Sequence, residues 1–218
     1  MATENWRLEL LGDRAVLAVC QKEVTAQHLA EAVRRAQWPG VLDVVVAYHS
    51  VAVHVDRFAA DFLPLLKRIR LKKVIAMPRL HHVPCCYEMG EDLDEVASQL
   101  MLTPQEVVEH HTSMTFSVFA VGFSPGFPYL GWLPRQLRGI SRRQEPRLTV
   151  PSGSVALVGK QSAIYPQATP GGWALIGRTP IKLVDVHAGY FPIKAGDKVK
   201  FESISREEFR KQAEELLR

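Results

Sequence analysis

The chain has 218 residues, a formal net charge of +4, 47% hydrophobic residues and 23% charged residues, which is typical of a globular protein with a sizeable core. Its basic residues are scattered and form no stripe with interleaved aromatic residues, which argues against a nucleic-acid-binding protein. No apolar run reaches the roughly 20 residues of a membrane-spanning helix, and the first residues are too polar for a signal peptide. We expect a cytoplasmic protein with no membrane and no nucleic-acid partner.

Cysteine usage favours a reducing compartment. The chain has three cysteines, namely Cys20 and the adjacent pair Cys85 and Cys86. Neighbouring residues on a strand point to opposite faces, so a bridge between Cys85 and Cys86 would need a distorted backbone. We therefore expect reduced thiols and no disulfide framework.

The N-terminal region predicts two β-hairpins. Residues 6–20 contain two short apolar runs around Gly12-Asp13, a dipeptide that favours a tight turn. Residues 41–48 and 51–55 are rich in β-branched side chains and are separated by a second short turn. These patterns predict four strands that pair as two hairpins.

Two helices are predicted alongside these hairpins. Thr25 is the expected N-cap of a helix over residues 26–37, which has an apolar face. Residues 58–70 also have a helical pattern, in which Pro64 should kink or delay the helix. Hairpins and helices in this order predict a small α/β sandwich over residues 1–76, with helices on one face of the sheet.

The second expected domain covers residues 77–218. An extended segment over 74–87 leads into it, and a short helix is predicted over 92–100. Thr103 opens a capping box with proline at the first helical position, a strong start signal for a helix that ends near His111.

Strands and loops are predicted to dominate residues 112–201, where glycine and proline are frequent and hydrophobic residues come in short runs. Ser205 opens a second capping box, and we expect the helix after it to run to residue 218. The whole chain is therefore predicted to be α+β. Rigid loops on a β scaffold are common places for binding and catalysis.

Two glycine motifs do not support catalysis or phosphate binding. Residues 122–126 match G-x-S-x-G, but Pro125 prevents the helix that follows the nucleophile in that motif. Residues 153–160 resemble a phosphate-binding loop only faintly, because five residues separate the glycines and Gln161 replaces the required Ser or Thr. We expect a tight turn in the first case and a strand in the second.

The paired histidines predict no metal site. Two adjacent residues, as in His81-His82 or His110-His111, cannot both face one ion from a regular element. His111 differs from the others because it ends a helix just before the glycine- and proline-rich region. A cationic imidazole is favoured there by the helix dipole, and a neutral imidazole could serve as a base.

Two further elements allow both a functional and a structural interpretation. Arg147 and the two arginines before it suit carboxylate or phosphate binding, but a solvated loop is equally compatible with them. Gly171-Gly172 beside Trp173 could bring the backbone close to a ligand, with an aromatic wall. The alternative is a tight turn packed on a core tryptophan.

Three blocks of sequence carry a specific resemblance. They are GFSPGFPYLGWLP (122–134), EPRLTVPSGSV (145–155) and QSAIYPQATPGGWALIGRT (161–179). In this order and spacing they resemble the family that includes the B subunit of the prokaryotic 5-oxoprolinase, the Kip-type sporulation-kinase inhibitor and the first-subunit domains of allophanate hydrolase. The match covers residues 85–200 well and the N-terminal domain in outline.

This resemblance implies a fold and an assembly. The implied fold is an N-terminal α/β domain followed by a cyclophilin-like β-barrel. The implied assembly has three chains: this one, a carboxyltransferase-like C subunit of the 5-oxoprolinase, and the A subunit of that enzyme. The resemblance also implies that this chain is inactive alone. Together the three chains would hydrolyse 5-oxo-L-proline to L-glutamate with ATP, which we expect the assembled complex to bind.

Other functions remain open. A regulatory protein that inhibits a sporulation-type histidine kinase is the main alternative that the resemblance allows. The barrel alone would suggest a peptidyl-prolyl isomerase, but fold does not decide function, and the Arg, Phe, Gln and His of a cyclophilin site cannot be placed here. A different lactam or a urea-like substrate also remains open.

The resemblance and the residue types together give an expected site without a metal ion. We expect His111 to act as an acid or base or to orient the substrate, and Arg147 to bind a carboxylate or phosphate. The expected substrate-binding residues lie in the three blocks: Phe123, Pro125, Gly126, Phe127, Tyr129, Pro151, Gly153, Ser154, Gln161, Tyr165, Pro170, Gly171, Gly172 and Trp173.

Overall fold

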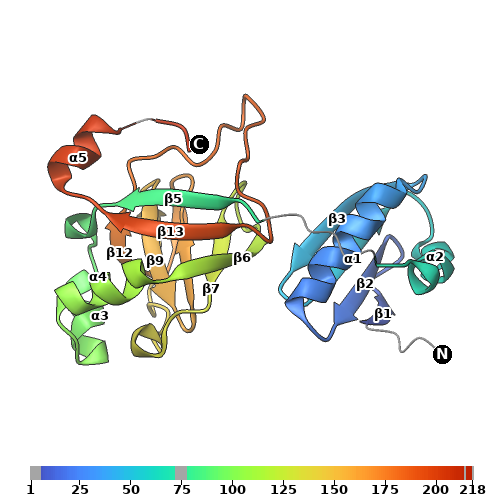
Figure 1. Cartoon of the computed structure of the whole chain (residues 1–218), viewed down its shortest axis with the longest axis horizontal. Coiled ribbons are helices and arrows are strands. Elements are labelled where there is room, and N and C mark those ends of the chain that lie inside the picture. Colours follow the sequence, from blue (N-terminus) through green and yellow to red (C-terminus); the bar gives the residue numbers. More distant parts are fainter. Residues whose placement is uncertain (1–5, 72–77, 214, 218) are drawn as a thin grey trace. The chain divides into compact units, whose positions relative to one another are not determined.

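The computed structural model describes residues 6–71, 78–213 and 215–217 (Figure 1). The chain divides into two compact units, residues 1–77 and 78–218. The expected domain boundary between residues 76 and 77 lies outside the described residues, as does the beginning of the extended segment predicted from residue 74. No helix in the described ranges is long and apolar enough to cross a membrane.

The first unit contains an antiparallel sheet with the strand order β1-β2-β4-β3. Both predicted hairpins are confirmed. Gly12 turns the chain between β1 and β2 with a φ of 69°, a value that favours glycine. The strands are β1 (Trp6–Leu10), β2 (Ala15–Cys20), β3 (Val41–Ala47) and β4 (Ser50–Val55).

Helix α1 (Glu23–Ala36) packs on β2, β3 and β4 and buries Leu29 and Val33 against them. It begins before the predicted start: Lys22 is its N-cap residue, with no side-chain cap, and Thr25 lies in the first turn. The predicted Thr25 cap is therefore wrong. Burial of one apolar face stabilises this helix, as is usual for helices in proteins.

The helix predicted over residues 58–70 is shorter and divided. A 3₁₀ turn, η1 (Ala59–Phe62), comes first, and α2 (Leu63–Arg68) follows it. Pro64 lies at the start of α2, where a missing backbone N–H costs no intrahelical hydrogen bond. The sequence predicted that Pro64 would either kink or delay the helix. The structure shows the second effect, a later start of the helix.

The second unit is built on a larger sheet with the strand order β5-β13-β6-β7-β10-β9-β12. Among the described strands of this sheet, only β5 and β13 pair in parallel. The strands are β5 (Leu80–Cys85), β6 (Thr115–Val121), β7 (Pro128–Gly131), β9 (Ser154–Val158), β10 (Gln161–Ile164), β12 (Ala174–Arg178) and β13 (Lys198–Ser203). A separate two-stranded sheet pairs β8 (Arg147–Val150) with β11 (Thr169–Gly171).

The architecture is therefore mixed α/β, dominated by antiparallel strands. The expected closed barrel is not seen in the described part of the chain, because its two edge strands, β5 and β12, share no ladder. One isolated antiparallel bridge joins Cys86, just after β5, to Arg178 at the end of β12. The chain then leaves the sheet in a 3₁₀ turn, η2 (Tyr87–Met89), which prevents further pairing.

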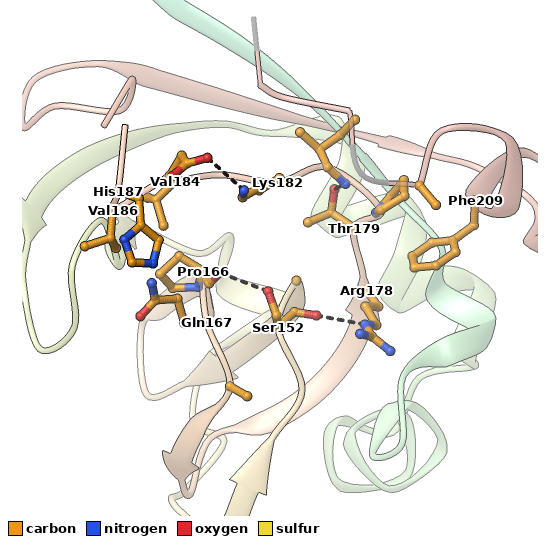
Figure 2. Close-up of a pocket in the computed structure, with 16 residues that line it drawn as sticks. Ser152, Pro166, Gln167, Arg178, Thr179, Lys182, Val184, Val186, His187 and Phe209 are labelled. Atoms are coloured by element: carbon orange, nitrogen blue, oxygen red, sulfur yellow. Dashed lines mark hydrogen bonds and ion pairs between the residues drawn. The ribbon is translucent and has the colours of Figure 1, made fainter. Parts of the chain in front are cut away.

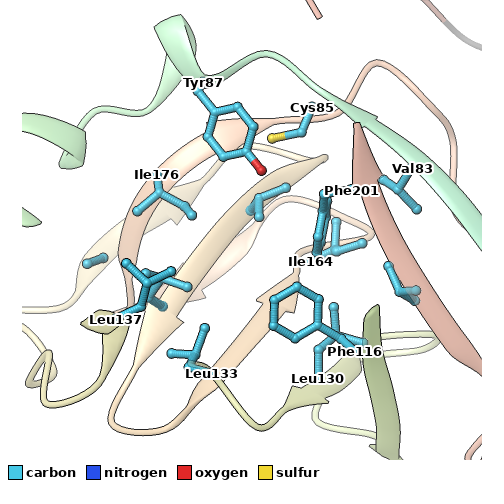
Figure 3. Close-up of a cluster of buried hydrophobic side chains, with 14 of the residues drawn as sticks. Val83, Cys85, Tyr87, Phe116, Leu130, Leu133, Leu137, Ile164, Ile176 and Phe201 are labelled. Carbon is cyan, nitrogen blue, oxygen red and sulfur yellow. The ribbon is translucent and has the colours of Figure 1, made fainter. Parts of the chain in front are cut away.

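Helices α3 (Leu93–Leu100) and α4 (Pro104–Ser113) cover the core of the second unit, and η3 (Arg135–Leu137) packs beside α4. Figure 3 shows the buried side chains of this core, which include Phe116, Phe201 and Ile176. The Thr103 capping box that predicted the start of α4 is confirmed.

Helix α5 (Arg206–Lys211) also begins at its predicted capping box, on Ser205. The expected continuation to residue 218 is wrong, because the helix ends at Lys211. Leu216 instead forms a parallel bridge with Lys182, and the backbone N–H of Leu217 donates to the Lys182 carbonyl. Long-range backbone pairing thus replaces the local helical preference.

Candidate functional site

Two adjoining pockets of the second unit share Arg178 and the turn at residues 151–154. The first, shown in Figure 2, has a volume of about 460 Å³ and includes Ser152 and Gly153 in its wall. The second has a volume of about 330 Å³ and includes Pro151 and Ser154. Three expected binding residues, Pro151, Gly153 and Ser154, therefore lie at the pockets.

Gly153 lets the turn pack against the end of β12. Its φ is 82°, and a Cβ added there would overlap the carbonyl oxygen of Thr179. Hydrogen bonds fix this close approach: the Gly153 N–H donates to the Tyr165 carbonyl at 2.7 Å, and the Thr179 N–H donates to the Gly153 carbonyl at 2.9 Å. Only glycine combines this backbone angle with this proximity.

Arg178 is held at the junction of the two pockets. Its backbone N–H and C=O both bond to Cys86, at 3.0 and 2.8 Å. Its Nε donates to the Ser152 carbonyl at 2.8 Å (Figure 2). A register shift in β12 before Gly177 helps to orient this end of the strand. A Cβ on Gly177 would lie 2.6 Å from Sγ of Cys85, so a larger residue would separate the strand from Cys86.

Two other turns line or support the first pocket. Pro166 and Gln167 follow β10 and form part of its wall (Figure 2). The buried Gly126 packs so tightly on Val184, another wall residue, that a Cβ would overlap its side chain. Pro125 is exposed next to it. The turn after β10 thus lines the first pocket, and the turn at Gly126 packs behind one of its wall residues.

The expected aromatic walls pack mainly against one another. Ring centroids of Phe127 lie 5.0 Å from Tyr129, 5.1 Å from Tyr165 and 5.9 Å from Trp173. Phe127, Tyr165 and Trp173 are almost fully buried and belong to a hydrophobic cluster, while Tyr129 is half-buried. Phe123 is 67% exposed at a φ of 73°. The three buried rings therefore support the pocket loops and do not line the pockets.

The glycines before Trp173 have a packing function as well. Gly171 pairs with Arg147 between β11 and β8, and a Cβ on it would overlap the Tyr165 hydroxyl. Gly172 is less tightly packed, since a Cβ added to it would lie no closer than 3.6 Å to its neighbours. Its carbonyl accepts a hydrogen bond from the Arg143 N–H at 2.9 Å. Pro170, within β11, is exposed. Of the two interpretations open from sequence, the turn packed on a buried tryptophan agrees with this geometry.

Arg147 is paired with the carboxylates of its own chain. Its Nη2 donates to Asp92 at 2.6 Å and its Nε lies 3.3 Å from Glu91. These partners raise its pKa, chiefly through the Asp92 hydrogen bond. Asp92 is buried and also accepts from Arg143 at 3.2 Å and from the Leu175 N–H at 2.7 Å. Arg147 thus pairs with carboxylates of the protein itself, whereas the sequence suggested a carboxylate or phosphate of a ligand.

His111 lies in the hydrophobic core and lines neither pocket. Its Nδ1 is 2.7 Å from the Tyr87 hydroxyl and its Nε2 is 3.0 Å from the Ser162 hydroxyl. The rings of Phe116 and Phe201 pack on it at centroid distances of 5.0 and 4.5 Å. Complete burial lowers its pKa to about 3, so the imidazole is neutral at pH 7. The cationic form considered from sequence is not favoured here.

Gln161, the remaining expected residue, starts β10, between Gly131 of β7 and Val158 of β9. Residues 154–158 form strand β9, so the faint phosphate-loop pattern is a strand, as predicted. Pro128 to Gly131 form β7, and no helix follows the turn at Ser124. In the described residues, no group of three or more His, Cys, Asp or Glu side chains could hold a metal ion.

The sequence analysis missed the functional potential of Arg178 and the anchoring role of Asp92. Arg178 was present in the third resembling block, but its side chain was not distinguished from the others there. Asp92 was recognised only as the beginning of a predicted helix. The signals that single them out are long-range contacts, with Cys86 for Arg178 and with Arg147 for Asp92.

A family model described as "Carboxyltransferase domain, subdomain C and D" matches residues 6–191. The chain belongs to this carboxyltransferase-domain family. It is 33% identical to the 5-oxoprolinase B subunit of Bacillus subtilis (strain 168), over 98% of this chain and 99% of that protein. It is 38% identical to the 5-oxoprolinase B subunit of Escherichia coli O157:H7, over 89% of this chain and 94% of that protein.

A solved structure of the protein TTHA0988 is also similar to this carboxyltransferase-domain chain. The TM-score is 0.75 and the sequences are 38% identical over 84% of this chain. The matched region is 37% of that protein, so this chain spans a little more than a third of its length. The curated relatives, in contrast, are covered almost completely.

Proposed function

We propose that this chain is one component of an ATP-dependent 5-oxoprolinase, which hydrolyses 5-oxo-L-proline to L-glutamate. The observation that carries the proposal is the similarity to three proteins named for the B subunit of 5-oxoprolinase. These are 33%, 38% and 40% identical to this chain and cover 98%, 89% and 74% of it. Identity at this level over most of each chain supports a common function.

The names of these relatives support an enzyme of several chains. We propose that its partners are the carboxyltransferase-like C subunit of the 5-oxoprolinase and its A subunit, and we expect this chain to be inactive alone. TTHA0988 is a much longer chain that contains a similar region, which is compatible with further parts joined to this one. The three cysteines are free, which favours a reducing compartment such as the cytoplasm.

The chemistry of the reaction explains the need for ATP. The lactam of 5-oxoproline is an unactivated amide, and phosphoryl transfer from ATP supplies the energy that makes its carbonyl carbon reactive. The described residues of this chain do not fit a nucleotide-binding loop, because strand β9 occupies the glycine-bounded segment 154–158. We therefore assign ATP binding to the assembled complex.

We assign substrate contact to the two pockets around Arg178, where residues 151–154 present backbone and hydroxyl groups. The buried aromatic residues beneath the turns keep these loops in place. His111 and Arg147 are proposed to act by positioning: His111 through Tyr87 and Ser162, and Arg147 through Asp92. Rigid support of this kind is what precise binding sites require.

We further propose that the second unit is a cyclophilin-like barrel that is almost open between its two edge strands, β5 and β12. The strand path runs from β5 to β12, and the Cys86–Arg178 bridge joins these two edges. In this interpretation the opening between the two edges is functional, because the residue that joins the edges also lines both pockets.

The proposal is tested by co-expression of this chain with its two candidate partner chains, followed by measurement of glutamate released from 5-oxoproline. We expect release only with all three chains and ATP. Omission of each chain in turn is the control. Absence of ATP-dependent glutamate release from the complete assembly, or full release without this chain, would overturn the proposed function.

A further inference from the structure

Arg178 differs from the other arginine and the lysine of the pockets in its ionic contacts. The lysine and the other arginine that line the pockets are paired: Lys182 with Asp185 at 2.9 Å, and Arg206 with Glu88 at 3.2 Å. In the described part of the chain no carboxylate pairs with Arg178, although it lines both pockets. It therefore gives the junction of the pockets an uncompensated positive charge.

The acidic side chains nearby are already engaged. Asp185 accepts from Lys182, and this hydrogen bond and that of the Ala188 N–H lower its pKa. Glu91, in the wall of the second pocket, lies 3.3 Å from Nε of Arg147. The protein's own acids thus remain with other partners, which leaves the Arg178 guanidinium open to an anionic ligand.

The guanidinium of Arg178 is oriented for such a ligand. Its Nε is occupied by the Ser152 carbonyl at 2.8 Å, which leaves the N–H groups of its two terminal nitrogens. These can donate to both oxygens of one carboxylate, a geometry that arginine provides and lysine does not. The two backbone bonds to Cys86 restrict movement of the residue. Little ordering is therefore needed when a ligand binds.

We propose that Arg178 binds the carboxylate of the substrate, an inference that rests on the proposed function. 5-Oxoproline carries a single carboxylate next to an uncharged lactam. The pockets match this pattern, since Arg178 supplies a cation that no carboxylate of the described residues pairs with, while Lys182 and Asp185 in the wall of the first pocket pair with each other. Arg147, which the sequence suggested for this role, is neutralised by Asp92 and Glu91.

The first test uses the assembled enzyme with Arg178→Lys and Arg178→Met. We expect the KM for 5-oxoproline to rise about 10- to 100-fold, as for the loss of hydrogen bonds to a charged group. 2-Pyrrolidinone, the same ring without a carboxylate, should inhibit the wild type and both variants equally. Arg210→Gln, on the exposed surface of α5, is the matched control and should leave KM unchanged.

The two ligands separate binding from structural damage. A distorted pocket would weaken the binding of both 5-oxoproline and 2-pyrrolidinone. Loss of a carboxylate contact would weaken the binding of 5-oxoproline alone. Unchanged KM in both Arg178 variants, or parallel weakening of the two ligands, would overturn the inference. The proposed function would still stand if the wild-type assembly released glutamate. Should Arg178→Met fail to fold, Arg178→Lys and the following measurement decide.

The second test does not require activity. The ¹⁵N-labelled chain gives an Nε–H NMR signal for Arg178, which Arg178→Lys identifies by its absence. We expect 5-oxoproline to shift this signal and 2-pyrrolidinone to leave it in place. If the assembly makes no glutamate, the proposed function fails, but a shift still supports a carboxylate site. No shift with 5-oxoproline, or a shift with ATP or inorganic phosphate alone, would overturn the inference.

Discussion

Arg147 donates from Nη2 to Oδ1 of Asp92 at 2.6 Å, and only 18% and 6% of the two side chains are exposed. Oδ2 of the same carboxylate accepts from the Leu175 N–H at 2.7 Å. The Asp92 N–H in turn donates to the Leu175 carbonyl at 2.8 Å. This pair therefore connects the start of α3, strand β8 and strand β12, and it fixes the strand that ends at Arg178.

Asp92→Asn is expected to destabilise the protein by about 3–5 kcal/mol, because it leaves the mostly buried Arg147 cation without its main counter-charge. Asp94→Asn is the matched control, since Asp94 is exposed on the same helix, and it should change stability by less than about 0.5 kcal/mol. Urea unfolding of both variants measures the difference. Equal stability of the two would contradict a structural role for the Asp92 pair.

Local sequence signals predicted the starts of two helices correctly. The capping boxes at Thr103 and Ser205 each involve residues three positions apart, so their physical basis lies within a few residues of sequence. The hairpin at Gly12 has the same local origin. The end of α5 was mispredicted because Leu216 pairs with Lys182, a contact that helical propensity cannot indicate.

The candidate site depended on contacts between distant residues, and its prediction was correspondingly incomplete. Of the glycine- and proline-rich turns that the sequence suggested, the one at Gly153 lines the pockets. Arg147 was chosen for its residue type, but its pairing with Asp92, 55 residues away, was invisible in the sequence. The burial of His111 likewise depends on residues from other elements, such as Phe201.

Gly153→Ala is expected to be more destabilising than a substitution that changes backbone preference alone. The added Cβ would overlap the Thr179 carbonyl and would also have to adopt a φ of 82°. Gly159→Ala is the matched control: its φ is 57°, but nothing lies within 4 Å of the new Cβ. In urea unfolding, the control substitution should lower the free energy of unfolding by about 1 kcal/mol. Gly153→Ala should lower it clearly more. Equal decreases in the two variants would show that the turn can move away from the Thr179 carbonyl without a loss of stability.

The three cysteines are expected to resist modification in the folded protein. All are buried, and burial raises the pKa of Cys20 to about 11 and also raises the pKa values of Cys85 and Cys86. Because the thiolate is the reactive form, each should react with a disulfide reagent at pH 8 more slowly than a free thiol, by about 100-fold for Cys20. All three should react rapidly in urea. Rapid native reaction of any one would contradict its burial.

His111 is expected to make the protein less stable as the pH falls. Its pKa is lowered from 6.5 to about 3 in the folded state, so the unfolded chain takes up the proton first. Stability due to neutral His111 is therefore complete above pH 6.5 and is lost progressively toward pH 3. The slope approaches about 1.4 kcal/mol per pH unit between these values.

His111→Gln isolates this contribution from the carboxylates that titrate in the same range. The variant should be less stable at pH 7, because glutamine cannot reproduce both the bonds to Tyr87 and Ser162 and the ring contacts with Phe116. Its stability should nevertheless decline less steeply from pH 6 to pH 4. His110→Gln, which alters the neighbouring half-buried histidine, should keep the wild-type slope. Urea unfolding at several pH values measures all three, and parallel profiles for the wild type and His111→Gln would show that the buried imidazole becomes protonated without unfolding.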